Sequence, residues 1–90
     1  MNDLEKRYGF AAELATLSNQ QIVRRFNAEV GNQGWNSARM YYLSCLGSEI
    51  RSRNFNSDAV FANGGLILLR EVKLENGLLE VMIPPKSKEG

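Results

Sequence analysis

The sequence contains no histidine and a single cysteine, Cys45. The absence of histidine excludes Ser-His-Asp and Cys-His catalysis and removes the commonest metal ligand in proteins. One cysteine cannot form an internal disulfide or a cysteine-rich zinc site. Because Cys45 has neither a histidine nor a CxxC partner, we interpret it as a thiol of the hydrophobic core.

Motifs that carry other kinds of chemistry are also missing. The ten acidic residues are scattered, without the spacing of a paired-carboxylate or EF-hand site. Gly64-Gly65 lacks the further glycines and the lysine of a phosphate-binding loop. We therefore expect a protein that is not an enzyme and that uses no cofactor and no metal.

Charge and hydropathy exclude further classes. The chain has no apolar run of about 18 residues, the length that a membrane span needs. Its net charge of +1 creates no overall field that would attract nucleic acid or an anionic membrane. The first ten residues, MNDLEKRYGF, are charged where a secretory signal needs an apolar core. We expect a cytoplasmic protein that does not enter the membrane.

The 90 residues are enough for one domain with a modest core. We place this domain at residues 1–85 and expect residues 86–90, which follow two prolines, to form a flexible tail. The first helix is predicted over residues 1–16, although Gly9 interrupts the apolar pattern and the helix could begin only after it. Ser18 and Gln21 have the spacing of a capping box and predict the start of a second helix, which ends before Gly31.

A third helix is predicted to start at Asn36 or Ser37, either of which can act as its cap, and to continue to about Asn54. Trp35, just before it, is expected to anchor the preceding loop between helices. The buried stripe of this helix and an ion pair on its surface also follow from helical spacing. The stripe contains Ala38, Tyr42, Leu46 and Ile50, with Leu43 and Cys45 beside it, and the ion pair joins Glu49 to Arg53.

After Asn56 the apolar pattern changes to that of strands. Residues 59–61 are a short strand candidate, and residues 66–75 and 78–83 are predicted as two strands joined by a tight turn at Asn76-Gly77. This turn fixes the register. The register places Leu74 opposite Leu79, Val72 opposite Val81 and Lys73 opposite Glu80. The predicted fold is therefore α+β, with two or three N-terminal helices packed on one face of a C-terminal antiparallel sheet of two or three strands.

The candidate binding surface lies in the central segment, residues 18–57. This segment carries five arginines and two glutamates, a net charge of +3. Arginine suits bidentate contact with phosphate or carboxylate, but local ion pairs on a solvated surface explain the same composition. The start of the third helix could likewise bind an anion or could be an ordinary capped helix end. Our candidate residues for a partner or anion surface are Arg24, Arg25, Asn36, Ser37, Arg39, Met40, Ser44 and Arg51.

Part of this surface is a strip of the third helix away from the buried stripe, which includes Met40, Ser44 and Gly47. Its small residues could admit a partner closely. Tyr41 also lies off the stripe, and it could belong to a partner surface or pack under the first helix. The sequence does not choose between these two interpretations of Tyr41.

Two functional hypotheses are favoured over a third, an enzyme that uses carboxylates or Cys45 alone. The first is a non-enzymatic interaction module that binds a protein partner or itself. The second is a nucleic-acid-binding domain, because the order of elements is similar to that of winged helix-turn-helix proteins and the central segment is rich in arginine. The outer face of the hairpin opposes this second hypothesis, since its three glutamates and one lysine would repel phosphate. A contiguous arginine patch would favour nucleic acid, whereas scattered arginines paired with glutamates would favour the interaction module.

Overall fold

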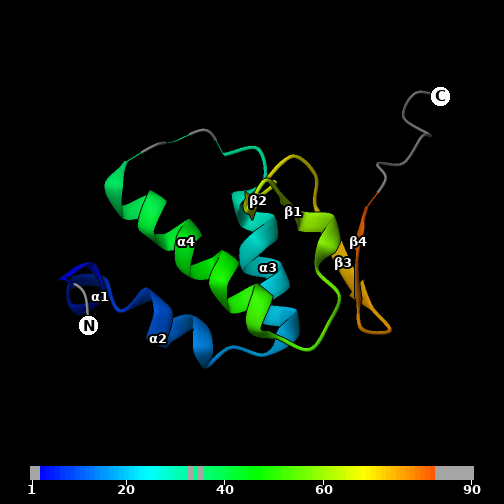
Figure 1. Cartoon of the computed structure of the whole chain (residues 1–90), viewed down its shortest axis with the longest axis horizontal. Coiled ribbons are helices and arrows are strands. Elements are labelled where there is room, and N and C mark those ends of the chain that lie inside the picture. Colours follow the sequence, from blue (N-terminus) through cyan, green and yellow to red (C-terminus); the bar gives the residue numbers. More distant parts are fainter. Residues whose placement is uncertain (1–2, 33, 35, 83–90) are drawn as a thin grey trace.

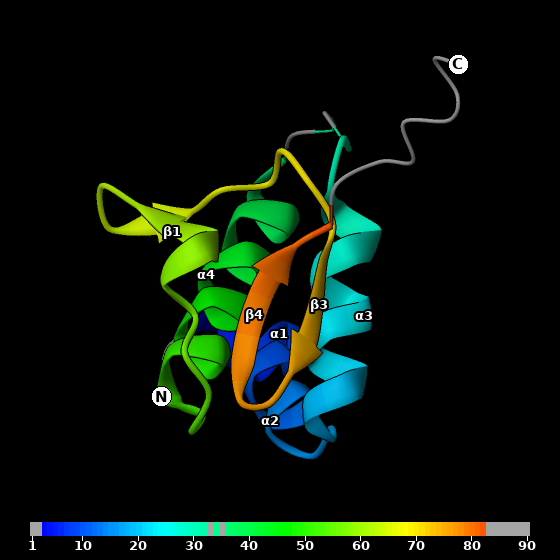
Figure 2. The ribbon, with the colours of Figure 1, turned by 90° about the vertical axis from the view of Figure 1, so that its right-hand side faces the viewer.

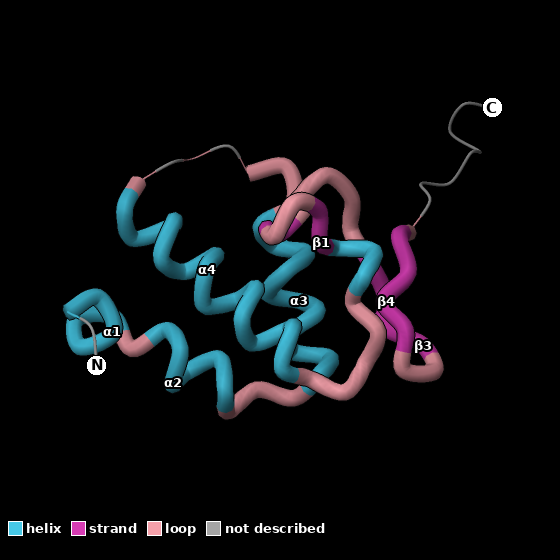
Figure 3. Tube along the Cα trace, viewed as in Figure 1, coloured by secondary structure: helices cyan, strands magenta, loops and turns pink. Residues whose placement is uncertain are grey.

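Helices precede strands along the chain in this computed structural model, which describes residues 3–32, 34 and 36–82 (Figures 1 and 3). The helices are α1 (Asp3–Tyr8), α2 (Phe10–Ala15), α3 (Asn19–Glu29) and α4 (Ser37–Ser52). A 3₁₀ turn, η1 (Asp58–Val60), leads into two hairpins, formed by β1 (Phe61–Ala62) with β2 (Gly65–Leu66) and by β3 (Val72–Glu75) with β4 (Leu78–Val81). The predicted α+β class is confirmed. Trp35 and the tail predicted at residues 86–90 lie outside the described residues.

Gly9 divides the predicted first helix into α1 and α2. Its φ of 67° is left-handed, a conformation that glycine adopts without the clash of a Cβ atom. The Glu5 carboxylate then caps α2, because its two oxygens accept hydrogen bonds from the backbone N–H groups of Ala11 and Ala12, both at 3.0 Å. These N–H groups have no partner within their own helix. Of the two predicted starts, the one near the N-terminus begins α1 and the one after Gly9 begins α2.

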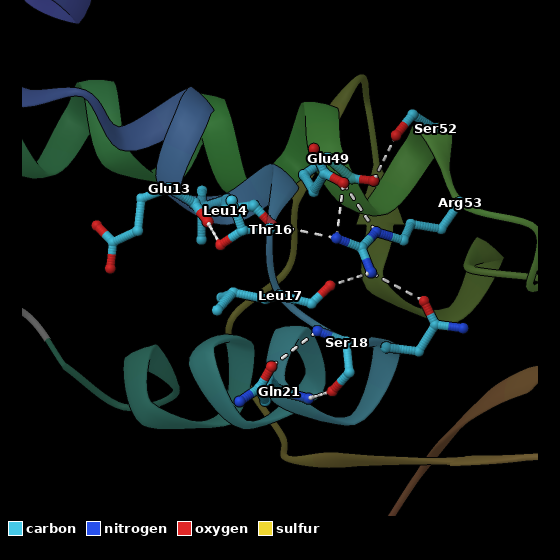
Figure 4. A network of polar contacts seen from close by, with 10 residues as sticks. Glu13, Leu14, Thr16, Leu17, Ser18, Gln21, Glu49, Ser52 and Arg53 are labelled. Carbon is cyan, nitrogen blue, oxygen red and sulfur yellow. Dashed lines mark hydrogen bonds and ion pairs between the residues drawn. The ribbon is translucent and has the colours of Figure 1, made fainter.

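The caps of the two longer helices are as predicted. The Ser18 hydroxyl accepts from the Gln21 backbone N–H at 3.1 Å, and the Gln21 side chain accepts from the Ser18 N–H at 2.8 Å (Figure 4). The Asn36 side chain accepts from the backbone N–H of Arg39 at 2.9 Å and caps α4. Such caps each contribute about 1 kcal/mol, and here they set where α3 and α4 begin.

One cluster of buried side chains joins the helices to the second hairpin. Leu14, Ile22 and Leu46, from three different helices, are fully inaccessible to solvent. The β3–β4 hairpin contacts α3 through β3 and η1 through β4, and its residues Val72 and Leu79 complete the cluster (Figure 2). The whole buried cluster contains Leu14, Ile22, Val23, Phe26, Cys45, Leu46, Ile50, Phe55, Val60, Val72 and Leu79.

The β3–β4 hairpin has the predicted turn and register. Asn76 and Gly77 both have positive φ, 53° and 75°, which a two-residue turn between twisted strands requires. Lys73 pairs with Glu80 across the strands, and their charged atoms lie 4.0 Å apart. The pairs Val72 with Val81 and Leu74 with Leu79 are also confirmed.

Side chains and loops hold both edges of this hairpin. The Asn27 amide of α3 donates to the Val72 carbonyl at 2.9 Å and accepts from the Val72 N–H at 2.8 Å. On the other edge, Asn56 donates from its N–H to the Gly77 carbonyl, and its own carbonyl accepts from the Leu79 N–H. The hairpin is therefore fixed to the helices by hydrogen bonds as well as by apolar burial.

The predicted strand over residues 66–75 is wrong. Asn63 and Gly64 have positive φ, 53° and 82°, and make a second tight turn of the same kind. This turn folds Gly65–Leu66 back onto Phe61–Ala62, so the strand pairing ends there. Residues 67–71 then connect the two hairpins, and only residues 72–75 pair with β4. The expected single sheet is thus two separate hairpins.

The Arg53 side chain, at the end of α4, joins three helices (Figure 4). Its guanidinium pairs with Glu49, one turn earlier, at 2.7 Å, as the i, i+4 spacing predicted. It also donates to the backbone carbonyls of Leu14 and Leu17 at 3.1 and 2.8 Å and to the Asn19 side chain at 3.0 Å. Only 13% of the side chain is exposed, so these bonds satisfy carbonyls at the end of α2 that water reaches poorly.

We expect Arg53→Ala to lower the free energy of unfolding by about 2–3 kcal/mol, because it leaves the Leu17 carbonyl and the Glu49 carboxylate without this donor and removes one of the two donors to the Leu14 carbonyl. Arg53→Lys should lose less, since it keeps the charge near Glu49 but cannot reach all the acceptors. Arg24→Ala is the control, because Arg24 is exposed and should change stability by less than about 0.5 kcal/mol. Urea unfolding followed by circular dichroism measures all three, and equal effects of Arg53→Ala and Arg24→Ala would contradict this role.

Candidate functional site

An open groove runs between α4 and the β1–β2 hairpin, with a volume of about 740 Å³. This volume falls within the range of roughly 300–1,000 Å³ that is usual for binding clefts. Helix α4 forms one wall with Met40, Leu43, Ser44, Gly47, Ser48 and Arg51. The hairpin and the chain after it form the other wall with Phe61, Gly64, Gly65, Leu66 and Leu68. Asn32 and Arg39 complete the lining at the start of α4.

The two walls meet at Gly47. This glycine is buried, and a Cβ atom added to it would lie 3.4 Å from Cγ of Leu66 and 3.7 Å from the Phe61 ring. Gly47 therefore does allow a close approach, as its small size predicted. The segment that approaches it is the β1–β2 hairpin of the same chain and not a partner. The rest of the strip, Met40 and Ser44, stays exposed beside the groove.

The groove has mainly apolar walls with polar groups at intervals. Leu43, Phe61 and Leu66 are partly buried against the core and give the walls a fixed base. Met40 is half exposed, at 50%, although methionine is a residue that usually packs away from water. An exposed methionine beside partly buried apolar side chains is typical of surfaces that contact another molecule.

Arg39 and Arg51 both line the groove, but only Arg39 has its charge paired with the carboxylate of a described residue. Arg39 pairs with Glu29 at 3.0 Å, donates to the Gly34 carbonyl at 3.0 Å and is only 12% exposed, so its charge is balanced within the chain. Its Nη2 atom lies 3.0 Å from the Glu29 oxygen without the alignment of a hydrogen bond. Arg51 is exposed, and its guanidinium lies 4.1 Å from the centre of the Phe61 ring. Arg51 forms no ion pair with any described residue.

The groove therefore brings together four of the eight residues predicted for a partner or anion surface: Arg39, Met40, Ser44 and Arg51. The other four do not line it. Arg24 is exposed on α3, and Arg25 pairs with Glu13 of α2 at 3.1 Å. A hydrogen bond with Tyr42, followed by the pairing with Glu13, raises the pKa of Arg25.

Asn36 and Ser37 form the start of α4. Asn36 is the cap, and its side chain occupies the Arg39 N–H that an anion would otherwise use. Its carbonyl also accepts from the Met40 N–H at 3.0 Å, and Ser37 is the first residue of the helix. These contacts are those of an ordinary capped helix end, which was one of the two interpretations of this region.

Sequence reasoning missed the hairpin wall of the groove. Phe61 was placed at the end of a short strand, and Leu66 and Leu68 were placed in a long strand that does not form. The sequence does predict a turn at Asn63-Gly64-Gly65, between residues 59–61 and the next strand. The prediction missed that this turn closes a separate hairpin, which ends at Leu66 and contacts α4.

Tyr41, on another side of α4, packs under the first two helices and not in the groove. Its ring stacks on Phe10 with centroids 5.9 Å apart, and Phe10 also contacts Tyr8 at 5.0 Å and Tyr42 at 5.1 Å. The Tyr41 hydroxyl donates to the Glu5 carboxylate at 2.6 Å. This resolves the open question about Tyr41 in favour of packing.

The hydrogen bonds around Glu5 change the pKa of two groups. Donation from Tyr41, and then from the Ala11 and Ala12 backbone, lowers the pKa of Glu5 below its ordinary value of 4.5. Hydrogen bonds with Cys45 and with Glu5 raise the pKa of Tyr41. Neither group faces the groove, so these shifts concern the attachment of α1 and α2.

In the described part of the chain, no group of three or more His, Cys, Asp or Glu residues lies close enough together to hold a metal ion. No helix there is both long and apolar enough to span a bilayer. Comparisons of the chain with known protein families, with curated proteins and with solved structures found no match.

We expect the free energy of unfolding to fall on acidification partly through Glu5. Because the pKa of Glu5 is lower in the folded chain than in the unfolded chain, its contacts stabilise the fold fully above pH 4.5. That stabilisation is lost as the pH falls through the lower, folded pKa. Glu5→Gln removes the carboxylate and Tyr41→Phe removes its strongest donor, so both should flatten the acid limb.

Urea unfolding at a series of pH values from neutral to acidic tests this expectation. The unchanged chain should lose more stability between pH 4.5 and lower values than either variant does. Parallel pH curves for the three proteins would show that the Glu5 carboxylate is not held by these contacts.

Proposed function

We propose that this chain is a small non-enzymatic interaction module that binds a protein partner in the groove between α4 and the β1–β2 hairpin. The observation that carries the proposal is the groove itself, in which half-exposed Met40 and exposed Arg51 stand beside partly buried apolar walls. Apolar side chains accompanied by arginine and methionine are characteristic of the centres of protein interfaces.

The shape of the groove also favours a protein segment over an enclosed small molecule. The groove is open along its length, and its walls come from α4 and from the segment spanning residues 61–68. Such a surface can hold an extended chain, with its side chains in the spaces between wall residues. A cytoplasmic location is part of this proposal.

The distribution of arginine supports protein binding over nucleic-acid binding. Three of the five central arginines pair with glutamates: Arg25 with Glu13, Arg39 with Glu29 and Arg53 with Glu49. These pairs neutralise most of the segment's positive charge, whereas nucleic-acid binding depends on unpaired cations facing phosphates. Lys73, on the outer face of the β3–β4 hairpin, is likewise close to Glu75 and Glu80.

A displayed library of short random peptides tests the proposed function. Peptides selected on the unchanged protein should lose binding to Ser44→Trp, because the indole would fill the groove from an exposed position on α4. Ala28→Trp is the matched control, since Ala28 is also an exposed helical residue and does not line the groove. If no peptide is selected, or if Ser44→Trp binds every selected peptide as well as Ala28→Trp does, the proposal is wrong.

Sedimentation at several concentrations identifies the case in which the partner is a second copy. In that case the chain would form a dimer that Ser44→Trp abolishes and Ala28→Trp preserves. A monomer at all concentrations, together with groove-dependent peptide binding, would assign the groove to a different protein.

We expect no salt-dependent binding of a labelled DNA duplex in fluorescence anisotropy at low salt. The reason is that Arg25, Arg39 and Arg53 are already paired and contribute few free cations. A rise in anisotropy that salt reverses, and that Arg24→Ala or Arg51→Ala weakens, would instead support nucleic-acid binding.

A further inference from the structure

The charges around the groove are unequal. Two cations line it, Arg39 and Arg51, and no acidic residue is among the described residues of its walls. Glu29 balances Arg39, which is largely buried. Arg51 therefore provides one uncompensated positive charge at the groove.

The contacts of Arg51 hold its charge in place without using its donors. The guanidinium lies 4.1 Å from the centre of the Phe61 ring, which also lines the groove, and this cation–π contact restricts the side chain. None of its N–H groups donates to a described residue. Arginine presents its donors as a planar fork that matches the two oxygens of a carboxylate.

Asp58 is an acidic residue near this charge. It lines a neighbouring hollow together with Arg51 and Phe61. It forms no ion pair with Arg51, and its backbone N–H is held by the Asn56 side chain at 2.9 Å. The Arg51 charge thus remains available to a ligand in the groove.

The spacing along α4 sets the length of a matching ligand. Met40 and Arg51 are eleven residues apart on one helix, a rise of roughly 16 Å. An extended peptide covers this distance with about five residues. The apolar end of the groove, near Met40 and Leu43, and its cationic end at Arg51 would therefore contact different residues of one short segment.

We propose that the groove binds an extended protein segment that carries a carboxylate for Arg51 and, about five residues away, an apolar side chain for the Met40 and Leu43 end. This inference rests on the proposed function, because it names the chemistry of the partner in the same groove. The chemistry is that of an acidic-apolar peptide. A phosphate group or a purely apolar segment would be a different ligand.

The peptides selected from the random library are the probe. They should share an aspartate or glutamate about five residues from a leucine, isoleucine, methionine or phenylalanine. One selected peptide is then labelled and made in two forms, one with its acidic residue and one with the matching amide. The affinity of each form is measured for the unchanged protein and for Arg51→Gln. Arg24→Gln is the control protein, since Arg24 is exposed and does not line the groove.

Either single change should weaken binding about tenfold, as expected for the loss of a charged hydrogen-bonded pair. The double change should weaken it little further, because both changes remove the same contact. Arg24→Gln should leave the affinity unchanged. Folding of each variant is checked by circular dichroism, so that a loss of binding is not a loss of structure.

The outcomes separate this inference from the proposed function. Peptides that bind in a Ser44→Trp-sensitive manner but share no acid, or whose binding Arg51→Gln leaves unchanged, would overturn the acidic-apolar ligand and keep the interaction module. Additive losses in the double change would also overturn the Arg51–carboxylate contact. If no selected peptide depends on the groove, the proposed function and this inference fail together.

Discussion

The placement of α4 depends on the contacts of two arginines, one at each end of the helix. At its C-terminal end, the Arg53 guanidinium gathers Glu49, two carbonyls near the end of α2 and a side chain at the start of α3. At its N-terminal end, Arg39 reaches back to Glu29 at the end of α3. Both side chains are largely buried, so the contacts are shielded from water and are stronger than exposed ion pairs. Because α4 is one wall of the groove, these contacts also fix the groove.

The other side of the core is held in a different way, by amide groups. Asn27 satisfies both backbone groups of Val72 and takes the place of a neighbouring strand along β3. A free strand edge is a site for unwanted pairing, and this amide closes part of it. The β1–β2 hairpin has lighter attachments, which include its contact with Gly47, the Arg51–Phe61 contact, and the bonds from Ile67 N–H to Val60 and from Gly31 N–H to Leu68. The groove thus has one firmly held wall and one wall with fewer attachments.

Features that depend on neighbours in the sequence were predictable. The Ser18 capping box, the Asn36 cap, the Glu49–Arg53 pair and the Lys73–Glu80 register each involve residues a few positions apart or joined by a tight turn, and all are present. The helix stripe around Leu46 and Ile50 was predictable for the same reason, since helical spacing alone places it.

Features that depend on distant parts of the chain were not predictable. Nothing in the sequence indicates that Asn27 will meet Val72, forty-five positions later, or that Arg53 will reach Leu14. The split of residues 66–75 had a local signal in Asn63-Gly64, but a continuous apolar run after it resembled one strand. Half of the candidate surface residues line the groove, because α4 carries several of them on one strip. Of the others, Arg24 is exposed on α3, Arg25 pairs with Glu13, and Asn36 and Ser37 form the start of α4.

Gly47 sets how closely the β1–β2 hairpin approaches α4, and a single substitution there would change this separation. Glycine inside a helix costs about 1 kcal/mol relative to alanine, so this position gives up helix stability for the close approach of Leu66 and Phe61. Alanine would just touch Leu66, and any longer side chain would move the hairpin away from α4. The width of the groove therefore depends on the residue at position 47, where its two walls meet.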